Sequence, residues 1–372
     1  MTVMLLALFA NAAPLERDAY VMRVGTDEAT VLWKTATNSS GQVRVFPPNS
    51  DPAIVVDSSP GLLHEVRVTG LSPDTEYSYE VFSDGVREAA GPSYFFRTAP
   101  PVGSREALRL WVVGDSGNGS SAQARVRDAM LASTGPDIPD LFLHVGDMAY
   151  SSGTEAEFTS NFFAPYRGIL RHTPIWPAMG NHEGYTADSA SETGGYYDAY
   201  ALPKNGEIGG VASGAEAYYS FDYANVHFVV LDSYETSRDP VNGAMAQWLV
   251  ADLEAAATRA VPPEWVVAYF HHPPYTDGTH DSETEGYHID MRMDFVPLLE
   301  AGGVDLVLGG HSHIYERSYL LHDEVQRNSD TSGVLDFGDG HPGGDGPYIK
   351  QADGNGNPIG ACLLYTSDAA DE

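Results

Sequence analysis

The sequence contains very little sulfur and few basic side chains. Only one of its 372 residues is a cysteine, Cys362, so the chain cannot form an internal disulfide or a thiolate metal cluster. Any metal ligands must therefore come from His, Asp, Asn and Tyr. Lys and Arg number 20 against 52 Asp and Glu, and the formal net charge is −32. This acidity favours solubility and argues against nucleic-acid binding by a basic surface.

Long apolar runs are also scarce. Residues 1–16 begin with a short apolar run that leads to small residues, which resembles the end of a secretory signal peptide. The run is too short to span a membrane, and no other segment is long and apolar enough. We therefore expect a secreted, periplasmic or cell-surface protein without a membrane span. An apolar N-terminus without a targeting role is the alternative.

Glycine and proline are frequent, at 38 and 24 residues, which indicates many turns and long loops. Between residues 17 and 99, short runs of strand-forming residues alternate with turn residues. About seven strands at such spacing predict an all-β sandwich. The expected strands are Tyr20–Val24, Thr30–Thr35, Val43–Phe46, Ile54–Val56, His64–Thr69, Glu76–Ser83 and Tyr94–Thr98.

One stretch of this first domain has a family likeness. The run Val66–Tyr79 resembles fibronectin type III-like modules, in which a Leu-x-Pro-x-Thr-x-Tyr turn precedes a strand. We find no grouping of His, Asp and Glu in this domain that would support chemistry. Its expected role is structural or in positioning the second domain.

A different pattern follows the linker at residues 99–104, and a second domain is predicted over residues 107–361. Short apolar runs now alternate with segments of helical periodicity, such as Ser121–Ala132 and Ala244–Arg259. This alternation predicts an α/β domain with layered strands and helices.

The C-terminal residues fit the α/β pattern poorly. Gly338–Gly360 is rich in Gly, Asp, Asn and Pro and is expected to be a loop. Residues 362–372 fit neither a strand nor a capped helix and look like translated sequencing-adapter read-through. We therefore expect a non-native tail and a catalytic domain truncated at its C-terminus. An ordinary acidic tail is the alternative.

Five apolar runs of the second domain each end in a polar cluster. Because strands in open α/β sheets gather ligands beyond their carboxyl ends, the loops that leave these strands can converge on one site. Glycines beside the polar residues allow tight turns and close backbone approach. The clusters are Gly114–Gly117, Gly146–Tyr150, Gly180–Glu183, His271–Tyr275 and Gly309–His313.

Each cluster is a weak signal alone, but together they offer oxygen and imidazole ligands that suit Fe, Mn or Zn. Two such cations about 3.5–4 Å apart can clamp the attacking and leaving oxygens of a phosphoester. A shared carboxylate must bridge them, and Asp147 is central enough to do so. The cations would also supply the local positive charge that a phosphate needs on so acidic a chain.

The order of the motifs resembles that of the purple acid phosphatases, which belong to the calcineurin-like metallophosphoesterases. The motifs are Gly-Asp-x-Gly, Gly-Asp-x-x-Tyr, Gly-Asn-His-Glu, His-x-Pro-x-Tyr and Gly-His-x-His. The resemblance extends from Asp18 to Tyr319 and implies a four-layer αββα domain after the sandwich. Most metallophosphoesterases have Asp-x-His in the first motif, whereas this chain has Ser116 and Gly117 after Asp115. The second motif instead carries Tyr150, the residue type that binds ferric iron in purple acid phosphatases.

The resemblance implies two metal sites that share one ligand. The ferric site would consist of Asp115, Tyr150, His313 and the bridging Asp147. The second site, for divalent Fe, Zn or Mn, would consist of Asn181, His271, His311 and again Asp147. His271 matches the family ligand because it stands two residues before Pro273, and His272 is the competing candidate.

Two further histidines are candidates for catalytic groups. His182 follows Asn181 directly and can donate to the phosphate or the leaving group, with support of the ligands as its alternative role. His280 begins a segment that resembles the family's His-x-x-Glu-x-Glu. Thr279 stands where plant members often have another histidine, and Tyr287–Asp290 looks like a small insertion. The other histidines are expected to serve packing, surface or supporting roles: His64, His144, His172, His227, His288, His322 and His341.

The resemblance implies an acid phosphatase that hydrolyses small phosphomonoesters by attack of a metal-bound hydroxide at an Fe(III)–divalent metal centre. A phosphodiesterase or nucleotide pyrophosphatase on the same centre is the alternative reaction. A surface-binding protein with an inactive enzyme domain is the alternative class, but all seven expected ligand positions are filled.

Overall fold

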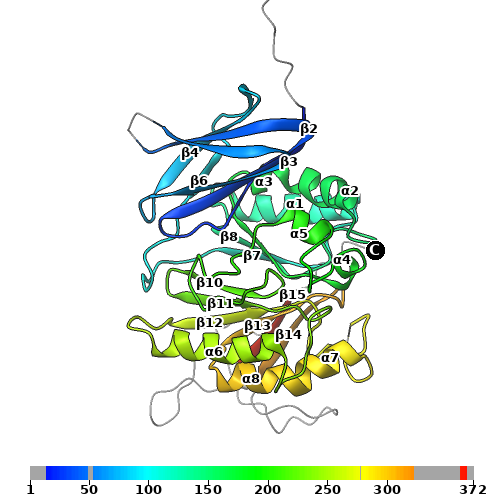
Figure 1. Cartoon of the computed structure of the whole chain (residues 1–372). Coiled ribbons are helices and arrows are strands. Elements are labelled where there is room, and N and C mark those ends of the chain that lie inside the picture. Colours follow the sequence, from blue (N-terminus) through cyan, green and yellow to red (C-terminus); the bar gives the residue numbers. More distant parts are fainter. Residues whose placement is uncertain (1–13, 49–52, 277, 322–360, 367–372) are drawn as a thin grey trace, which may run out of the picture.

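The computed structural model describes residues 14–48, 53–276, 278–321 and 361–366, the last six and 319–321 by their backbone (Figure 1). The expected signal segment lies outside these residues apart from its last three positions. None of the described helices combines the length and the apolar character needed to cross a membrane. A β-sandwich lies on one end of a larger domain in which two sheets are flanked by helices.

Six strands form the N-terminal sandwich. They are β1 (Leu15–Met22), β2 (Glu28–Phe46), β3 (Ile54–Thr69), β4 (Glu76–Ser83), β5 (Val86–Ala89) and β6 (Phe95–Arg97). The first part of β2 pairs with β1 and the end of β3, whereas its last part pairs with β4 and the start of β3. Register shifts around Ser39 mark the bend, so the continuously bonded sheet folds over into two layers.

Buried and exposed side chains alternate along the strands, and the buried ones fill the space between the two layers. In β4 the side chains of Tyr77, Tyr79 and Val81 are buried, whereas Glu76 and Ser78 are exposed. They join the buried Trp33 of β2 in one apolar cluster. This period of two is what a half-buried strand requires. The predicted sandwich is therefore present, but two pairs of the expected strands are continuous in β2 and β3.

The second domain contains two sheets. One is parallel, with the order β7-β8-β9, and the other has the order β10-β11-β12-β13-β15-β14. In the larger sheet β11, β12, β13 and β15 are parallel, while β10 and β14 are antiparallel to their neighbours. The strands are β7 (Leu110–Val113), β8 (Leu141–His144), β9 (Ile175–Pro177), β10 (Tyr219–Tyr223), β11 (Val226–Val230), β12 (Trp265–Tyr269), β13 (Leu306–Leu308), β14 (Tyr315–Leu321) and β15 (Ala361–Thr366).

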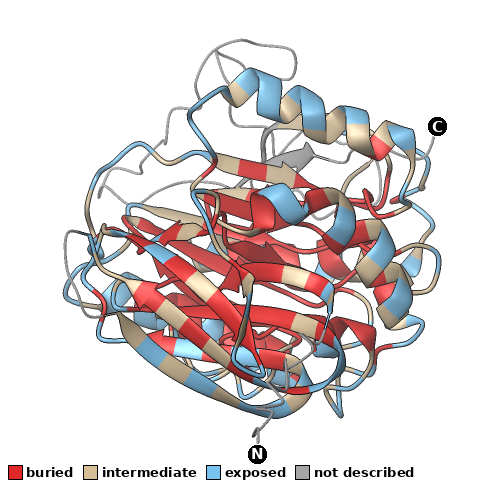
Figure 2. Cartoon of the chain, turned by 90° about the horizontal axis from the view of Figure 1, so that it is seen from above, coloured by how far each residue is buried: buried red, intermediate tan, exposed pale blue. Residues whose placement is uncertain are grey.

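The two sheets pack face to face. The ring of Trp176 in β9 stacks on Phe221 in β10, with 3.8 Å between the ring centroids. The hydroxyl of Tyr269 donates to the carbonyl of Trp176, and that of Tyr219 donates to the carbonyl of Pro177. These buried aromatic residues belong to one apolar core that both sheets share, and the red interior of Figure 2 shows its extent.

Helices cover the outer faces of both sheets. α1 and α3 lie toward the sandwich and α6 and α8 lie on the far side, which completes the predicted αββα layering (Figure 1). The expected helices at Ser121–Ala132 and Ala244–Arg259 are confirmed as α1 and α6. The helical elements are α1 (Ser121–Thr134), α2 (Glu155–Glu157), η1 (Phe158–Phe163), α3 (Ala164–Leu170), α4 (Asn181–Gly184), α5 (Gly195–Ala199), α6 (Ala244–Thr258), α7 (Gly286–Asp290), η2 (Met291–Phe295) and α8 (Val296–Ala301).

The sandwich contacts the second domain through buried polar groups. The Tyr20 hydroxyl donates to the carbonyl of Ala199 over 2.7 Å. Asp18 forms an ion pair with Arg171, and the side chain of Arg17 is fully buried in a pair with Glu155. Such directional contacts fix the orientation of the sandwich on the helices beneath it.

One feature differs from the expectations drawn from the sequence. Residues 362–366, in the tail expected to fit neither a strand nor a helix, belong to β15, which lies between β13 and β14. The five strands that lead to the polar clusters are divided between the two sheets of the αββα domain. The expected domain limits stay predictions; β6 ends at Arg97 and β7 begins at Leu110.

Candidate metal centre

The predicted ligands all follow the carboxyl ends of parallel strands. Asp115 comes after β7, Asp147 after β8, and Asn181 begins the short α4 after β9. From the other sheet, His271 follows β12, and β13 leads to His311 and His313. Because the two sheets are stacked, these carboxyl ends meet at one edge of the domain. The structure therefore brings all seven predicted ligands together.

The backbone at this edge is strained. Asp115, Asp147, His311 and His313 have φ values of 54°, 57°, 68° and 52°. This left-handed region is uncommon for residues other than glycine and costs about 1–3 kcal/mol each time. The hydrogen bond from the His311 N–H to Asp115 Oδ2, of 2.8 Å, ties two of these positions together. Surrounding structure thus holds the loops in conformations that they would not adopt alone.

Glycines beside the ligands allow the loops of the site to approach one another closely. A Cβ added to Gly180 would overlap the carboxylate and backbone of Asp147, and one added to Gly310 would lie 2.7 Å from Asp115 Oδ2. A Cβ at Gly117 would overlap the carbonyl of Met148. The glycines of the sequence motifs are therefore required by space in the folded site.

Three of the side chains converge around the phenol of Tyr150. Its oxygen lies 3.3 Å from Asp115 Oδ1, 3.2 Å from Asp147 Oδ2 and 3.3 Å from His313 Nε2. His313 Nε2 also lies 3.4 Å from Asp115 Oδ1. We call these residues, Asp115, Asp147, Tyr150 and His313, the tyrosine group.

The remaining side chains converge around His271. Its Nε2 atom lies 3.0 Å from Asn181 Oδ1, 3.2 Å from His311 Nδ1 and 3.3 Å from Asp147 Oδ2. We call Asn181, His271, His311 and Asp147 the histidine group. Asp147 belongs to both groups, and its Oδ2 atom faces both.

Of the two neighbouring histidines, His271 is the one that faces the carboxylates. Its other ring nitrogen, Nδ1, donates to the carbonyl of Val145 over 2.9 Å, which turns Nε2 toward the carboxylates. His272 instead bonds to Ser233 Oγ through Nδ1 and stacks on Tyr287. The geometry favours His271 over His272 as a ligand.

The site has a strongly negative electrostatic character. Asp115 and Asp147 are both buried, and within the described part of the chain neither pairs with Lys or Arg. Burial lowers the pKa of His271, but the charges of Asp147 and Asp115 outweigh burial and raise this pKa to about 10. Burial likewise opposes ionisation of Asp147, but His271 and His182 hold its pKa well below the ordinary range. Two buried carboxylates that neither Lys nor Arg neutralises within the described residues are suited to bind metal ions.

The two candidate catalytic histidines lie on different sides of the site. The His182 Nδ1–H donates to the carbonyl of Ser151 over 2.6 Å, so that Nε2 lies 3.9 Å from Asp147 Oδ2. The imidazole of His280 stacks on His311, 3.7 Å between centroids, and its Nδ1 bonds to Glu285. Both rings are partly exposed, and both border the histidine group or Asp147.

Comparison with known families agrees with this arrangement. The family model of the calcineurin-like phosphoesterases matches residues 108–315, which include all seven predicted ligands and both catalytic candidates. The chain belongs to this family. The match covers the αββα domain from β7 to β13 and ends where β14 begins.

Relatives within this family include purple acid phosphatases. Purple acid phosphatase 15 of Arabidopsis thaliana is 33% identical over 288 residues, which are 71% of this chain and 51% of the relative. Purple acid phosphatase 23 of the same plant is 29% identical over 84% of the chain and 69% of the relative. The chain thus spans about half the length of the first of these curated relatives. A purple acid phosphatase from yellow lupin (Lupinus luteus) seeds has the same fold, with a TM-score of 0.66 at 17% identity over 95% of this chain and 64% of that chain.

One residue of this phosphoesterase domain was not assigned a role from the sequence. Glu183 is fully buried and accepts hydrogen bonds from the backbone N–H groups of Asp147, Met148, Ala149 and Gly180. Burial, reinforced by Asp147, raises its pKa to about 7. The only sequence signal was its place in the Gly-Asn-His-Glu motif. Three of its four partners, Asp147, Met148 and Ala149, lie 34–36 residues away in sequence, so the motif could not reveal its function.

Proposed function

We propose that this protein hydrolyses phosphomonoesters as a purple acid phosphatase, at a centre of one ferric and one divalent ion. The observation that carries the proposal is the position of the Tyr150 phenol among Asp115, Asp147 and His313. Where most metallophosphoesterases have a histidine, this chain has Gly117, and a side chain there would overlap the carbonyl of Met148. The phenol thus stands in place of that imidazole in the first ligand set.

The donors of the two groups fit the two proposed ions. Phenolate and carboxylate oxygens of the tyrosine group suit Fe(III), and the amide, imidazole and carboxylate donors of the histidine group suit divalent Fe, Zn or Mn. Asp147 would be shared between them, because its Oδ2 lies 3.2 Å from the Tyr150 oxygen and 3.3 Å from His271 Nε2. When bound, such a pair of cations neutralises phosphate charge and activates water.

His182 is proposed as the group that protonates the leaving alkoxide. The bond from its Nδ1–H to Ser151 fixes the tautomer and turns Nε2 toward the centre. The backbone N–H of the same residue donates to Asp147 Oδ1 over 3.0 Å, which couples its position to the shared carboxylate. In the imidazolium form both ring nitrogens carry hydrogen, and the Nε2 proton can pass to the oxygen that leaves phosphorus, which returns the ring to the neutral Nδ1–H tautomer.

His280 is proposed as a second donor to the substrate. Its Nδ1 is engaged by Glu285, so Nε2 is the atom that remains for a phosphate oxygen. The ring is partly exposed and stacks on His311, which places it at the side of the histidine group. Loss of this donor should raise KM more than it lowers kcat, because it contacts phosphate in both ground and transition states.

The test of the iron–tyrosine assignment is a visible spectrum with metal analysis. Purified wild type with iron and a divalent metal should show a phenolate-to-iron charge-transfer band, and Tyr150→Phe should lack it. Tyr185→Phe makes the same chemical change at an exposed ring outside both groups and should retain the band. A colourless wild type with a full complement of iron would refute the assignment.

The reaction is tested by turnover of paired substrates. Phosphomonoesters and phosphodiesters with the same leaving group should be compared at acidic and neutral pH. Preference for the monoester supports the proposal. Dominant diester cleavage would favour a phosphodiesterase or nucleotide pyrophosphatase on the same centre, and metal-loaded protein without turnover of either would favour the inactive binding protein.

A further inference from the structure

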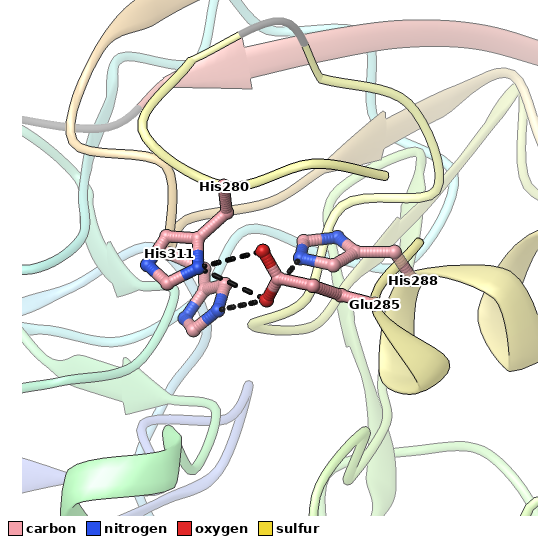
Figure 3. A group of neighbouring side chains, drawn as sticks. All are labelled: His280, Glu285, His288 and His311. Carbon is pink, nitrogen blue, oxygen red and sulfur yellow. Dashed lines mark hydrogen bonds and ion pairs between the residues drawn. The ribbon is translucent and has the colours of Figure 1, made fainter. Parts of the chain in front are cut away.

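A third group of potential ligands lies beside the histidine group (Figure 3). The carboxylate of Glu285 points between the rings of His280, His288 and His311. Its Oε2 atom lies 3.0 Å from His280 Nδ1 and 3.8 Å from His288 Nε2. One ligand atom from each residue of this group lies within 4.8 Å of all the others.

His288 supplies the observation that points to a ligand. Its side chain is fully buried, and its Nδ1–H donates to the carbonyl of Pro273 over 2.5 Å. Nε2 therefore carries a lone pair, and it has no hydrogen-bond partner among the described residues. At 3.8 Å the Glu285 oxygen is beyond hydrogen-bond distance, and a carboxylate could not donate to that lone pair. A buried lone pair without a donor is costly unless a cation or water satisfies it.

We propose that His280, Glu285 and His288 form an additional binding site for a divalent cation, with Zn²⁺ as the best-suited ion. Two imidazoles and one carboxylate, with a fourth position left for water or substrate, are a recurrent zinc ligand set. Metal–ligand bonds of about 2.0–2.2 Å in tetrahedral geometry separate the ligand atoms by about 3.3 Å. The separations of 3.0 Å and 3.8 Å around Glu285 Oε2 lie on either side of that value.

The additional site would adjoin the proposed two-metal centre through one imidazole ring. His311 presents Nδ1 to His271 at 3.2 Å and Nε2 to Glu285 Oε2 at 3.8 Å. A third cation there would place further positive charge beside the phosphate, on a chain whose net charge is −32. His288 lies on α7, within the segment Tyr287–Asp290 that resembles an insertion relative to the purple acid phosphatases.

The experiment is a count of bound Zn²⁺. The full chain is stripped of metal, reloaded with Zn²⁺, separated from weakly bound ions and analysed by mass spectrometry of the metal. Wild type should bind one equivalent more than His288→Gln and Glu285→Gln, which keep side-chain size but remove a ligand. His172→Gln is the matched control, because this ring stacks on Phe95 away from the three groups and should leave the count unchanged. Equal counts in wild type and His288→Gln would overturn the proposal.

A further variant separates this inference from the proposed function on which its location rests. Asp147→Ala should remove the ions of the two-metal centre and leave the additional equivalent. If wild type binds one ion that is lost in His288→Gln but kept in Asp147→Ala, the additional site stands and the two-metal centre fails. If wild type binds two ions that His288→Gln keeps and Asp147→Ala loses, the two-metal centre stands and the additional site fails. Circular dichroism of each variant checks that the change in count does not come from unfolding.

Discussion

Glu183 Oε2 accepts a 2.8 Å hydrogen bond from the backbone N–H of Asp147, the residue shared by both ligand groups. Its other oxygen, Oε1, accepts from Met148 at 2.8 Å and from Ala149 at 3.0 Å. One buried carboxylate therefore holds the loop that carries the shared ligand in its left-handed turn. Among the seven proposed ligands, the Glu183 side chain bonds only to the backbone N–H of Asp147. Glu183 therefore acts as a positioning residue.

Replacing Glu183 by Gln should disturb this loop. The amide keeps one acceptor oxygen but turns an NH₂ group toward backbone donors, leaving buried N–H groups unsatisfied at about 1–3 kcal/mol each. Displacement of Asp147 by about 1 Å should lower kcat about 10²-fold. Denaturant unfolding, metal content and kcat should all fall together. Asp188→Asn, in an exposed turn where the side chain also accepts backbone N–H groups, should change each by little. Unchanged metal content and kcat in Glu183→Gln would contradict the positioning role.

Gly180→Ala tests whether the close approach of two loops is needed for the site. The backbone angles of Gly180 suit alanine, at φ −99° and ψ 177°, so the expected effect is purely steric. Its new methyl group would overlap the Asp147 carboxylate, and metal binding and turnover should fall by at least about 10²-fold.

The matched change is Gly168→Ala, in the middle of α3 where the added methyl meets nothing within 4 Å. This variant should gain about 0.5–1 kcal/mol of stability from helix propensity and keep full activity. Equal turnover in the two variants would show that the tight packing at Gly180 is not required.

The ligands could be predicted from the sequence because their clusters follow apolar runs. Four of them, Asp115, Asp147, Asn181 and His311, also stand beside a glycine that the folded site needs. Gly180 and Gly310 are local signals of this kind. The αββα layering was implied by the family resemblance, but the order of the strands within the two sheets could not be predicted, because strand length and hydrophobicity do not specify which strands pair. Likewise, β2 continues past Ser39 because pairing with β3 resumes beyond the bend, a long-range contact that turn residues alone do not reveal.

The roles of Glu183 and His288 were hidden for a related reason. Both are short-range neighbours of motif residues, yet their partners come from other segments: Asp147 for the first and Pro273 for the second. The sequence does not show whether a buried histidine serves packing or ligand binding. The direction of its lone pair in the folded chain distinguishes the two roles.

The ion pair between the buried Arg17 and the partly exposed Glu155 should stabilise the docking of the sandwich. Arg17 is fully buried, lies 2.6 Å from Glu155 Oε1, and its guanidinium stacks on Phe163. Glu155→Gln leaves a buried charge without its partner and should destabilise the chain by about 3 kcal/mol. The exposed pair of Arg97 and Asp74 is the control, and Asp74→Asn should cost less than about 1 kcal/mol. Urea unfolding of both variants measures the difference, and equal costs would mean that this contact does not hold the domains together.

His227 should make stability depend on alkaline pH. It is buried between Asp222 and Asp252, with Nδ1–O and Nε2–O distances of 2.8 Å and 2.9 Å. Burial opposes protonation, but the hydrogen bonds and charges of the two carboxylates raise its pKa from 6.5 to about 9. The folded state therefore binds the proton more tightly than the unfolded chain, by about 3 kcal/mol.

Because the folded pKa is raised, this stabilisation is complete below about pH 6.5 and is lost as the pH rises through about 9. Urea unfolding at pH 6 and at pH 9.5 should show wild type losing about 3 kcal/mol more than His227→Gln, which cannot titrate. The variant should also be less stable at pH 6, since Asp222 and Asp252 lose the cation between them. Parallel pH profiles for the two proteins would mean that His227 is neutral in the fold and that Arg259, which also pairs with Asp222, balances the charge alone.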